Sequence, residues 1–190
     1  MSGPRRPAAR REPPRSLDQA EVDQLLALVA TASRRDRAIV ALFLYAGLRL
    51  DELRMLDRDD IAWAERRIVV RRGQGGQCRR LALHPAAAAA LRAYLARRPD
   101  PDPALFLSRN RRRLSRRAIQ VLVARFGVQL RPPRRITPRC LRRTFAALLC
   151  RSSGGDRRLV RRALGHGAIR TTTIDAGVED AVLFSAMDRL

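Results

Sequence analysis

The sequence of 190 residues contains no lysine, so all 40 of its basic side chains are arginines. Acidic residues are also scarce, at 18, and the chain carries a formal charge of +22. Such an excess favours a polyanionic partner, because cationic side chains release the counterions that surround phosphates. GC-rich coding would explain the use of arginine in place of lysine, but not the excess charge. The charge therefore predicts binding to nucleic acid.

Cysteines are few and odd in number. Cys78, Cys140 and Cys150 lack the spacing of metal ligands, so we expect reduced thiols and neither a metal nor a cofactor. The longest apolar run, residues 38–48, is too short to span a bilayer. The N-terminus has no apolar stretch of the kind that forms a secretory signal. We therefore expect a cytoplasmic protein with no membrane partner.

The composition divides the chain into a short arm and one domain. Residues 1–15 contain four prolines and five arginines, which predicts a flexible basic arm. Asp18 and Glu21 have the spacing of a capping box, which predicts that a helix begins there. An apolar fraction of 46% and the remaining length suit a single globular domain over residues 16–190.

Hydrophobic periodicity predicts a mainly α domain with a small antiparallel β-sheet. Helices are expected from Asp18 through Val29, over 34–46 and ending at Gly47, around Glu52, after Pro85, and over about 115–126, 138–151 and 156–164. Two strands, 68–70 and 80–83, are joined by the glycine-rich segment GQGGQ at 73–77, which favours a tight hairpin. Residues 104–107 are the candidate for a third strand.

Four motifs carry a resemblance to a known family. They are AGLRLDEL at 46–53, TPRCLRRTFA at 137–146, LGH at 164–166 and TTTID at 171–175. In this order they resemble the catalytic domain of the tyrosine recombinases, the phage-integrase family. The resemblance covers about residues 16–178. It implies the fold of these DNA breaking-rejoining enzymes and a role in DNA recombination or integration, typical of phages and other mobile elements.

Three positions match the active-site pattern that the resemblance implies. Arg49 and Arg142 match the two arginines that clamp the phosphate, a task that suits the planar guanidinium group because it donates two hydrogen bonds at once. His166 matches the second histidine of the family. A histidine that only packs at a helix end is the alternative for His166.

Three other positions depart from the pattern. Gln74 stands where the general-acid lysine is expected, and an amide cannot donate a proton to the leaving oxygen. Arg139 replaces the first histidine and could contact phosphate without serving as an acid or base. Asp175 replaces the nucleophilic tyrosine, and its negative charge would be repelled by the phosphate. Tyr45 and Tyr94, the two tyrosines of the chain, occupy apolar helix positions and are expected in the core.

The leading hypothesis is a DNA-binding, integrase-like pseudoenzyme that is impaired in strand cleavage. From the length we expect no amino-terminal domain of the kind with which full family members clamp DNA. Other recombinase subunits are candidate partners. Two alternatives remain: an active recombinase whose nucleophile comes from a partner, and a basic RNA-binding or structural protein. The side chains expected to contact duplex DNA are Arg49, Arg71, Arg72, Arg79, Arg80, Arg139, Arg142 and Arg143.

Overall fold

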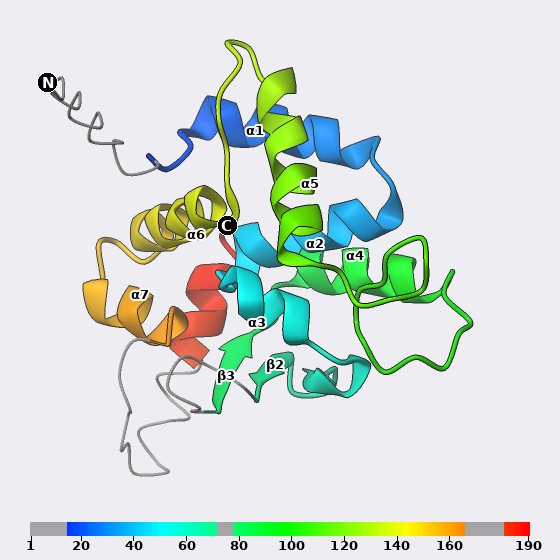
Figure 1. Cartoon of the computed structure of the whole chain (residues 1–190). Helices are drawn as coiled ribbons and strands as arrows, with labels where there is room; N and C mark the ends of the chain where they lie inside the picture. Colours follow the sequence, from blue (N-terminus) through cyan, green and yellow to red (C-terminus); the bar gives the residue numbers. More distant parts are fainter. Residues whose placement is uncertain (1–14, 72–77, 166–180) are drawn as a thin grey trace, which may run out of the picture.

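The structure, a computed structural model, describes residues 15–71, 78–165 and 181–190. These residues form a mainly helical domain with one small sheet, as predicted (Figure 1). Residues 181–187 are also helical, and this segment was not predicted. The other helices are α1 (Gln19–Ala30), α2 (Arg34–Ala46), α3 (Leu50–Met55), the 3-10 turn η1 (Arg58–Asp60), α4 (Pro85–Leu95), α5 (Arg116–Gln129), α6 (Pro138–Ser152) and α7 (Arg157–Ala163).

The sheet has three antiparallel strands in the order β1 (Ile61–Ala62), β2 (Arg67–Val70) and β3 (Arg79–Ala82). The predicted pairing of β2 with β3 is confirmed. The prediction of a strand at 104–107 is wrong, because Ala104 and Leu107 form only isolated bridges. The buried guanidinium of Arg98 donates hydrogen bonds to the carbonyls of Ala104 and Leu105, so these carbonyls do not join a β-ladder.

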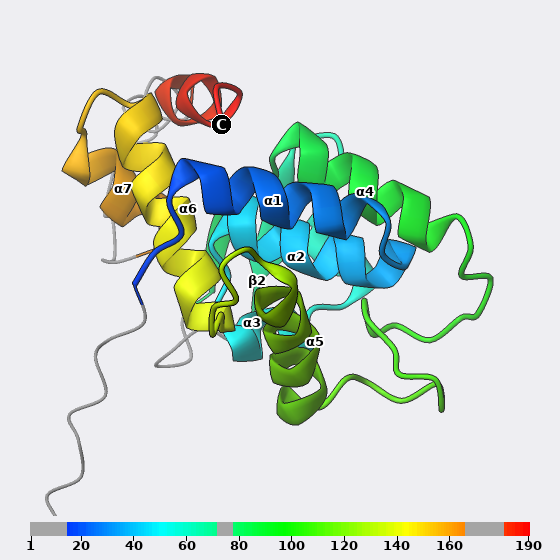
Figure 2. The same ribbon diagram turned by 90° about the horizontal axis from the view of Figure 1, so that it is seen from above.

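Helix α2 is the centre of the core. Its residues 38–46 are all buried, which explains why they form an unbroken apolar run instead of an amphipathic stripe. The helix packs against α4 and α6, which lie beside it in Figure 2. The helix ends at Gly47, whose φ of 58° is the left-handed conformation that glycine adopts at little cost. Within the described residues, no helix is long and apolar enough to cross a membrane.

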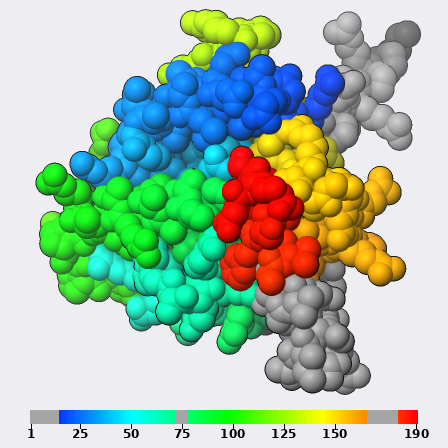
Figure 3. All heavy atoms as spheres, turned by 180° about the vertical axis from the view of Figure 1, so that it is seen from behind, coloured from blue at the N-terminus to red at the C-terminus, as the bar shows by residue number. Residues whose placement is uncertain are grey.

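The C-terminal helical segment packs on the back of the domain, beside α4 and α6 (Figure 3). Its residues Leu183, Ala186 and Met187 are buried in a small cluster with Phe145 of α6. The contact joins two segments that are far apart in the sequence. It packs the C-terminal segment against α6, on which part of the candidate site lies.

Candidate functional site

A buried carboxylate gathers arginines from three separate elements. The side chain of Glu52, in α3, is only 3% exposed. It accepts a hydrogen bond from the backbone amide of Arg49 at 2.7 Å, one from Arg49 Nη1 at 2.8 Å and one from Arg79 Nη2 at 2.6 Å. Nη1 of Arg142, in α6, lies 4.0 Å from Glu52 Oε2. Glu52 was not among the predicted site residues, although its place three residues after Arg49 was a usable signal.

A close approach of α6 to the turn after α2 brings Arg142 to this cluster. A Cβ atom on Gly47 would lie 2.8 Å from Phe145 Cε1 and closer still to Cδ1, so only glycine lets α6 pack this closely here. Thr137 caps α6 by accepting a hydrogen bond from the Cys140 amide at 3.1 Å. Arg142 then lies just beyond the first turn of α6 and donates to the Gly47 carbonyl.

Strand alternation selects which arginine of β3 reaches the cluster. Arg79 pairs with the buried Val70 and turns inward, whereas the next residue, Arg80, is exposed. The guanidinium of Arg79 also donates to the carbonyl of Leu164, the residue that ends α7. Arg142 Nη2 donates to the same carbonyl at 3.0 Å. The site is therefore held by α3, β3, α6 and the end of α7 together.

The charges of the cluster shift one another's pKa values. Burial alone would raise the pKa of Glu52, but hydrogen bonds from Arg49 and the positive charge of Arg79 lower it overall. Burial, and then repulsion from Arg49 and Arg79, lowers the pKa of Arg142 to about 10. Arg142 is therefore still protonated at neutral pH. Among the described residues, the cluster holds three guanidinium groups and one carboxylate, an arrangement suited to an anion.

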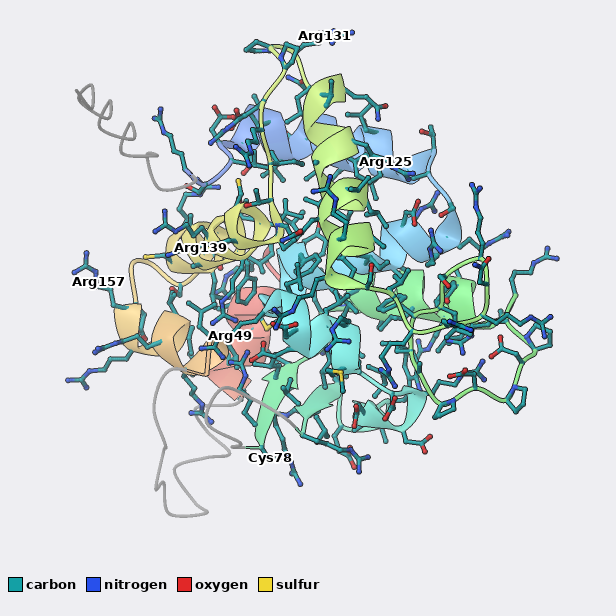
Figure 4. All side chains as sticks on the ribbon, in the orientation of Figure 1. Arg49, Cys78, Arg125, Arg131, Arg139 and Arg157 are labelled. Carbon is teal, nitrogen blue, oxygen red and sulfur yellow. The ribbon has the colours of Figure 1, made fainter. Side chains whose placement is uncertain are left out.

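The other predicted arginines that the structure describes are exposed. Arg71 is 62% exposed and pairs with the buried Asp60. Arg139 and Arg143 are exposed on α6. Figure 4 shows Arg49 near the middle of the molecule, between α3 and the α6–α7 pair. Four of the predicted residues lie outside the part of the chain that the structure describes: Arg72, Gln74, His166 and Asp175.

Both tyrosines pack with the core, as predicted. Tyr45 is 9% exposed and its ring is stacked on His84, and burial raises the pKa of its hydroxyl. Tyr94 is stacked on Phe106, with the ring centroids 5.4 Å apart. Its hydroxyl lies 3.5 Å from the amide of Leu107. These contacts are those of structural side chains.

Comparisons with known proteins identify the family of the chain. The model of the phage integrase family matches residues 15–180. The tyrosine recombinase XerC of Pseudomonas aeruginosa is 38% identical over 195 residues, which cover 100% of this chain and 62% of that protein. The chain thus spans about three fifths of the length of this curated relative.

Solved structures show the same fold. The crystal structure of XerA recombinase has a TM-score of 0.73 and 28% identity, over 96% of this chain and 62% of that one. The XerH site-specific recombinase, solved bound to its difH substrate, has a TM-score of 0.69 and 23% identity, over 90% of this chain and 51% of that one. The mainly helical domain has the catalytic fold of the tyrosine recombinases, and with the matches over residues 15–180 this shows that the chain belongs to the phage integrase family.

Proposed function

We propose that this chain binds duplex DNA by holding one backbone phosphate with Arg49 and Arg142, and that it is impaired in strand cleavage. The observation that carries the proposal is the cluster of three arginines around the buried Glu52. A phosphodiester presents paired oxygens that match the fork of a guanidinium group. The integrase of the transposon Tn1549, a protein of the same fold, is solved in complex with transposon right end DNA, which supports duplex DNA as the partner.

The two arginines are prepared for this task in different ways. Arg142 is held by the carbonyls of Gly47 and Leu164, so its side chain loses little freedom when an anion binds. Arg49 is tied to Glu52 through Nη1, and with 31% of its side chain exposed it faces solvent. Glu52 keeps Arg49 in this orientation. In the family's chemistry, such a pair stabilises the charge that builds on the non-bridging oxygens.

Strand cleavage needs groups that this chain has replaced. A tyrosine oxygen would attack phosphorus to form a phosphotyrosyl bond, while the 5′ oxygen leaves and takes a proton from a general acid. The carboxylate of Asp175 is repelled by the phosphate, and its side chain is shorter than that of tyrosine. The amide of Gln74 has no proton to give at neutral pH. Arg139 stands in place of a histidine that could exchange protons. The proposal is therefore DNA binding without efficient cleavage.

The wider contact with DNA is also part of the proposal. The exposed Arg80, Arg139 and Arg143 would touch the backbone on either side of the held phosphate, together with Arg71 and Arg72 beside the hairpin. The basic arm 1–15 would add non-specific attraction to the domain 16–190. The chain would act in the cytoplasm, on its own or beside other recombinase subunits.

A salt titration tests the phosphate contact. We would measure the affinity of the full chain for a labelled duplex by fluorescence anisotropy, for wild type, Arg142→Ala and Arg97→Ala. Arg97 is exposed at the end of α4, so its replacement removes the same charge away from the cluster. Arg142→Ala should weaken binding about tenfold or more and lower the salt slope by about 0.9, the value of one lost phosphate contact. Equal losses for both variants would reduce the claim to bulk charge, and equal competition by RNA would favour the RNA-binding alternative.

A covalent trapping experiment tests the loss of cleavage. Nicked duplexes from the DNA that flanks the gene would be incubated with wild type and with the Asp175→Tyr, Gln74→Lys double variant, then run on a denaturing gel. We expect an adduct with the double variant and none with wild type. An adduct with wild type would contradict the proposed impairment. No adduct with either protein would contradict the claim that these two replacements are what stops the reaction.

A further inference from the structure

Arg79 is the least exposed arginine of the cluster and links two elements that lie far apart in the sequence. Its side chain is 12% exposed, against 13% for Arg142 and 31% for Arg49. Nη2 donates to Glu52 at 2.6 Å, and Nη1 donates to the carbonyl of Leu164. The side chain thus joins α3 to the end of α7, which lies 85 residues beyond Arg79 along the chain.

The backbone at the end of α7 approaches this guanidinium closely. Gly165 follows Leu164 with a φ of 65°, and a Cβ atom there would lie 2.7 Å from Arg79 Cδ and closer still to Nη1. Any larger residue would displace the guanidinium from the Leu164 carbonyl. Because Arg142 donates to the same carbonyl at 3.0 Å, the position of Leu164 helps to set that of Arg142, which the Gly47 carbonyl also holds.

The positive charge of Arg79 is compensated within the fold more closely than that of Arg142. Nη2 of Arg79 forms an ion pair with Glu52 at 2.6 Å, whereas Nη1 of Arg142 lies 4.0 Å from the same carboxylate and donates to the neutral Gly47 carbonyl. Nη1 of Arg79 is engaged by Leu164, and Nε is buried, with no hydrogen-bond partner among the described residues. Yet its positive charge repels Arg142 closely enough to help lower the pKa of that group. Arg79 therefore acts on the site through geometry and charge, and not through contact.

We infer that Arg79 is a positioning residue of the phosphate site: by bridging Glu52 and the Leu164 carbonyl, it holds the end of α7 so that Arg142 meets the phosphate, without touching the phosphate itself. The inference rests on the function proposed above. It separates Arg79 from Arg80, the adjacent arginine on the same strand, which is exposed and would make an ordinary backbone contact.

The first test is Arg79→Lys, which keeps the charge but loses the planar fork that makes two hydrogen bonds in fixed directions. In the same anisotropy titration with a labelled duplex, this variant should bind about tenfold more weakly, the effect of one lost charged hydrogen bond. Its salt slope should equal that of wild type, because no phosphate contact is lost. Wild-type affinity for Arg79→Lys would overturn the inference, and so would a slope reduced by about 0.9.

A second test reaches the same bridge from its other side. Gly165→Ala should displace the Arg79 guanidinium and weaken DNA binding to a similar extent. The matched control is Gly154→Ala. Gly154 has a φ of 67°, but a Cβ atom added there would meet nothing within 4 Å. The two variants therefore share the cost of the left-handed backbone, and only Gly165→Ala adds a collision. Thermal unfolding of each variant checks that it is folded at the temperature of the binding assay, so that the affinities of folded proteins are compared. Wild-type affinity for Gly165→Ala would contradict the inference.

The double variant decides whether the two changes act on one bridge. Arg79→Lys with Gly165→Ala should bind no more weakly than either single variant, because the bridge can be broken only once. Additive losses would overturn the inference. Arg142→Ala separates this outcome from the proposed function. If Arg142→Ala weakens DNA binding as expected and Arg79→Lys does not, only the inference fails. If Arg142→Ala binds DNA as well as Arg97→Ala does, the proposed function itself is contradicted.

Discussion

The imidazole of His84 lies almost parallel to the ring of Tyr45, with the ring centroids 4.5 Å apart and an angle of 12° between the planes. His84 also caps α4 by accepting a hydrogen bond from the Ala86 amide at 3.0 Å. Burial lowers the pKa of His84, although Asp188 and the Met187 backbone act in the opposite direction. The buried ring is therefore neutral at neutral pH and joins α2, α4 and the C-terminal segment.

This lowered pKa predicts that acid destabilises the fold. Below the ordinary histidine pKa of about 6.5, the unfolded chain takes up a proton that folded His84 resists. The free energy of unfolding should therefore fall as the pH drops from about 7 toward 5. Urea denaturation across this range measures the slope. His84→Asn keeps a capping acceptor without the titration, so its slope should be flatter. An unchanged slope in His84→Asn would assign the effect to other groups.

Gly47→Ala should destabilise the domain by more than a backbone cost alone. The left-handed φ of 58° costs about 1–2 kcal/mol for alanine, and the new Cβ would also collide with Phe145. The total loss in the free energy of unfolding should be about 3 kcal/mol or more. Gly154→Ala, with a similar φ and open space around it, should lose only the backbone part. Equal losses in urea denaturation would show that Phe145 makes room.

Glu52→Gln should lower the free energy of unfolding by about 3 kcal/mol at neutral pH, because it removes one partner of buried ion pairs. The pKa of Glu52 is lowered on folding, so its contribution is present above the unfolded pKa and is lost as the pH falls through the folded pKa. The free energies of unfolding of the variant and wild type should therefore converge at acid pH. Asp51→Asn, on the same helix but 47% exposed, should lose less than about 1 kcal/mol. Parallel stability curves for wild type and Glu52→Gln down to acid pH would contradict this role.

Tyr45 and Tyr94 should be dispensable for any adduct. In the Asp175→Tyr, Gln74→Lys background, phenylalanine at either position should leave the yield of trapped protein–DNA adduct unchanged, since both rings are stacked in the fold. Each hydroxyl loss should cost about 1 kcal/mol of stability at most. An adduct that disappears with Tyr45→Phe, in a variant that still folds, would identify Tyr45 as a nucleophile.

Local signals in the sequence were enough for most of the helices. Asp18 and Glu21 form the predicted capping box, with each side chain bound to the other's backbone amide. Gly47 ends α2 as predicted, because a left-handed residue is a property of a few neighbouring positions. The strand expected at 104–107 was wrong because its backbone groups found a distant partner in Arg98. The arm 1–15 and the roles of Gln74, His166 and Asp175 stay predictions.

The sequence alone determined the family, and through its motifs it pointed to Arg49 and Arg142. Only the tertiary structure decided that Arg79, and not Arg80, joins them, and that Glu52 lies at the centre. The reason is physical: burial and the repulsion or attraction between charges depend on distances in space, and these residues are brought together by packing between α3, β3 and α6. No local pattern in the chain contains those distances.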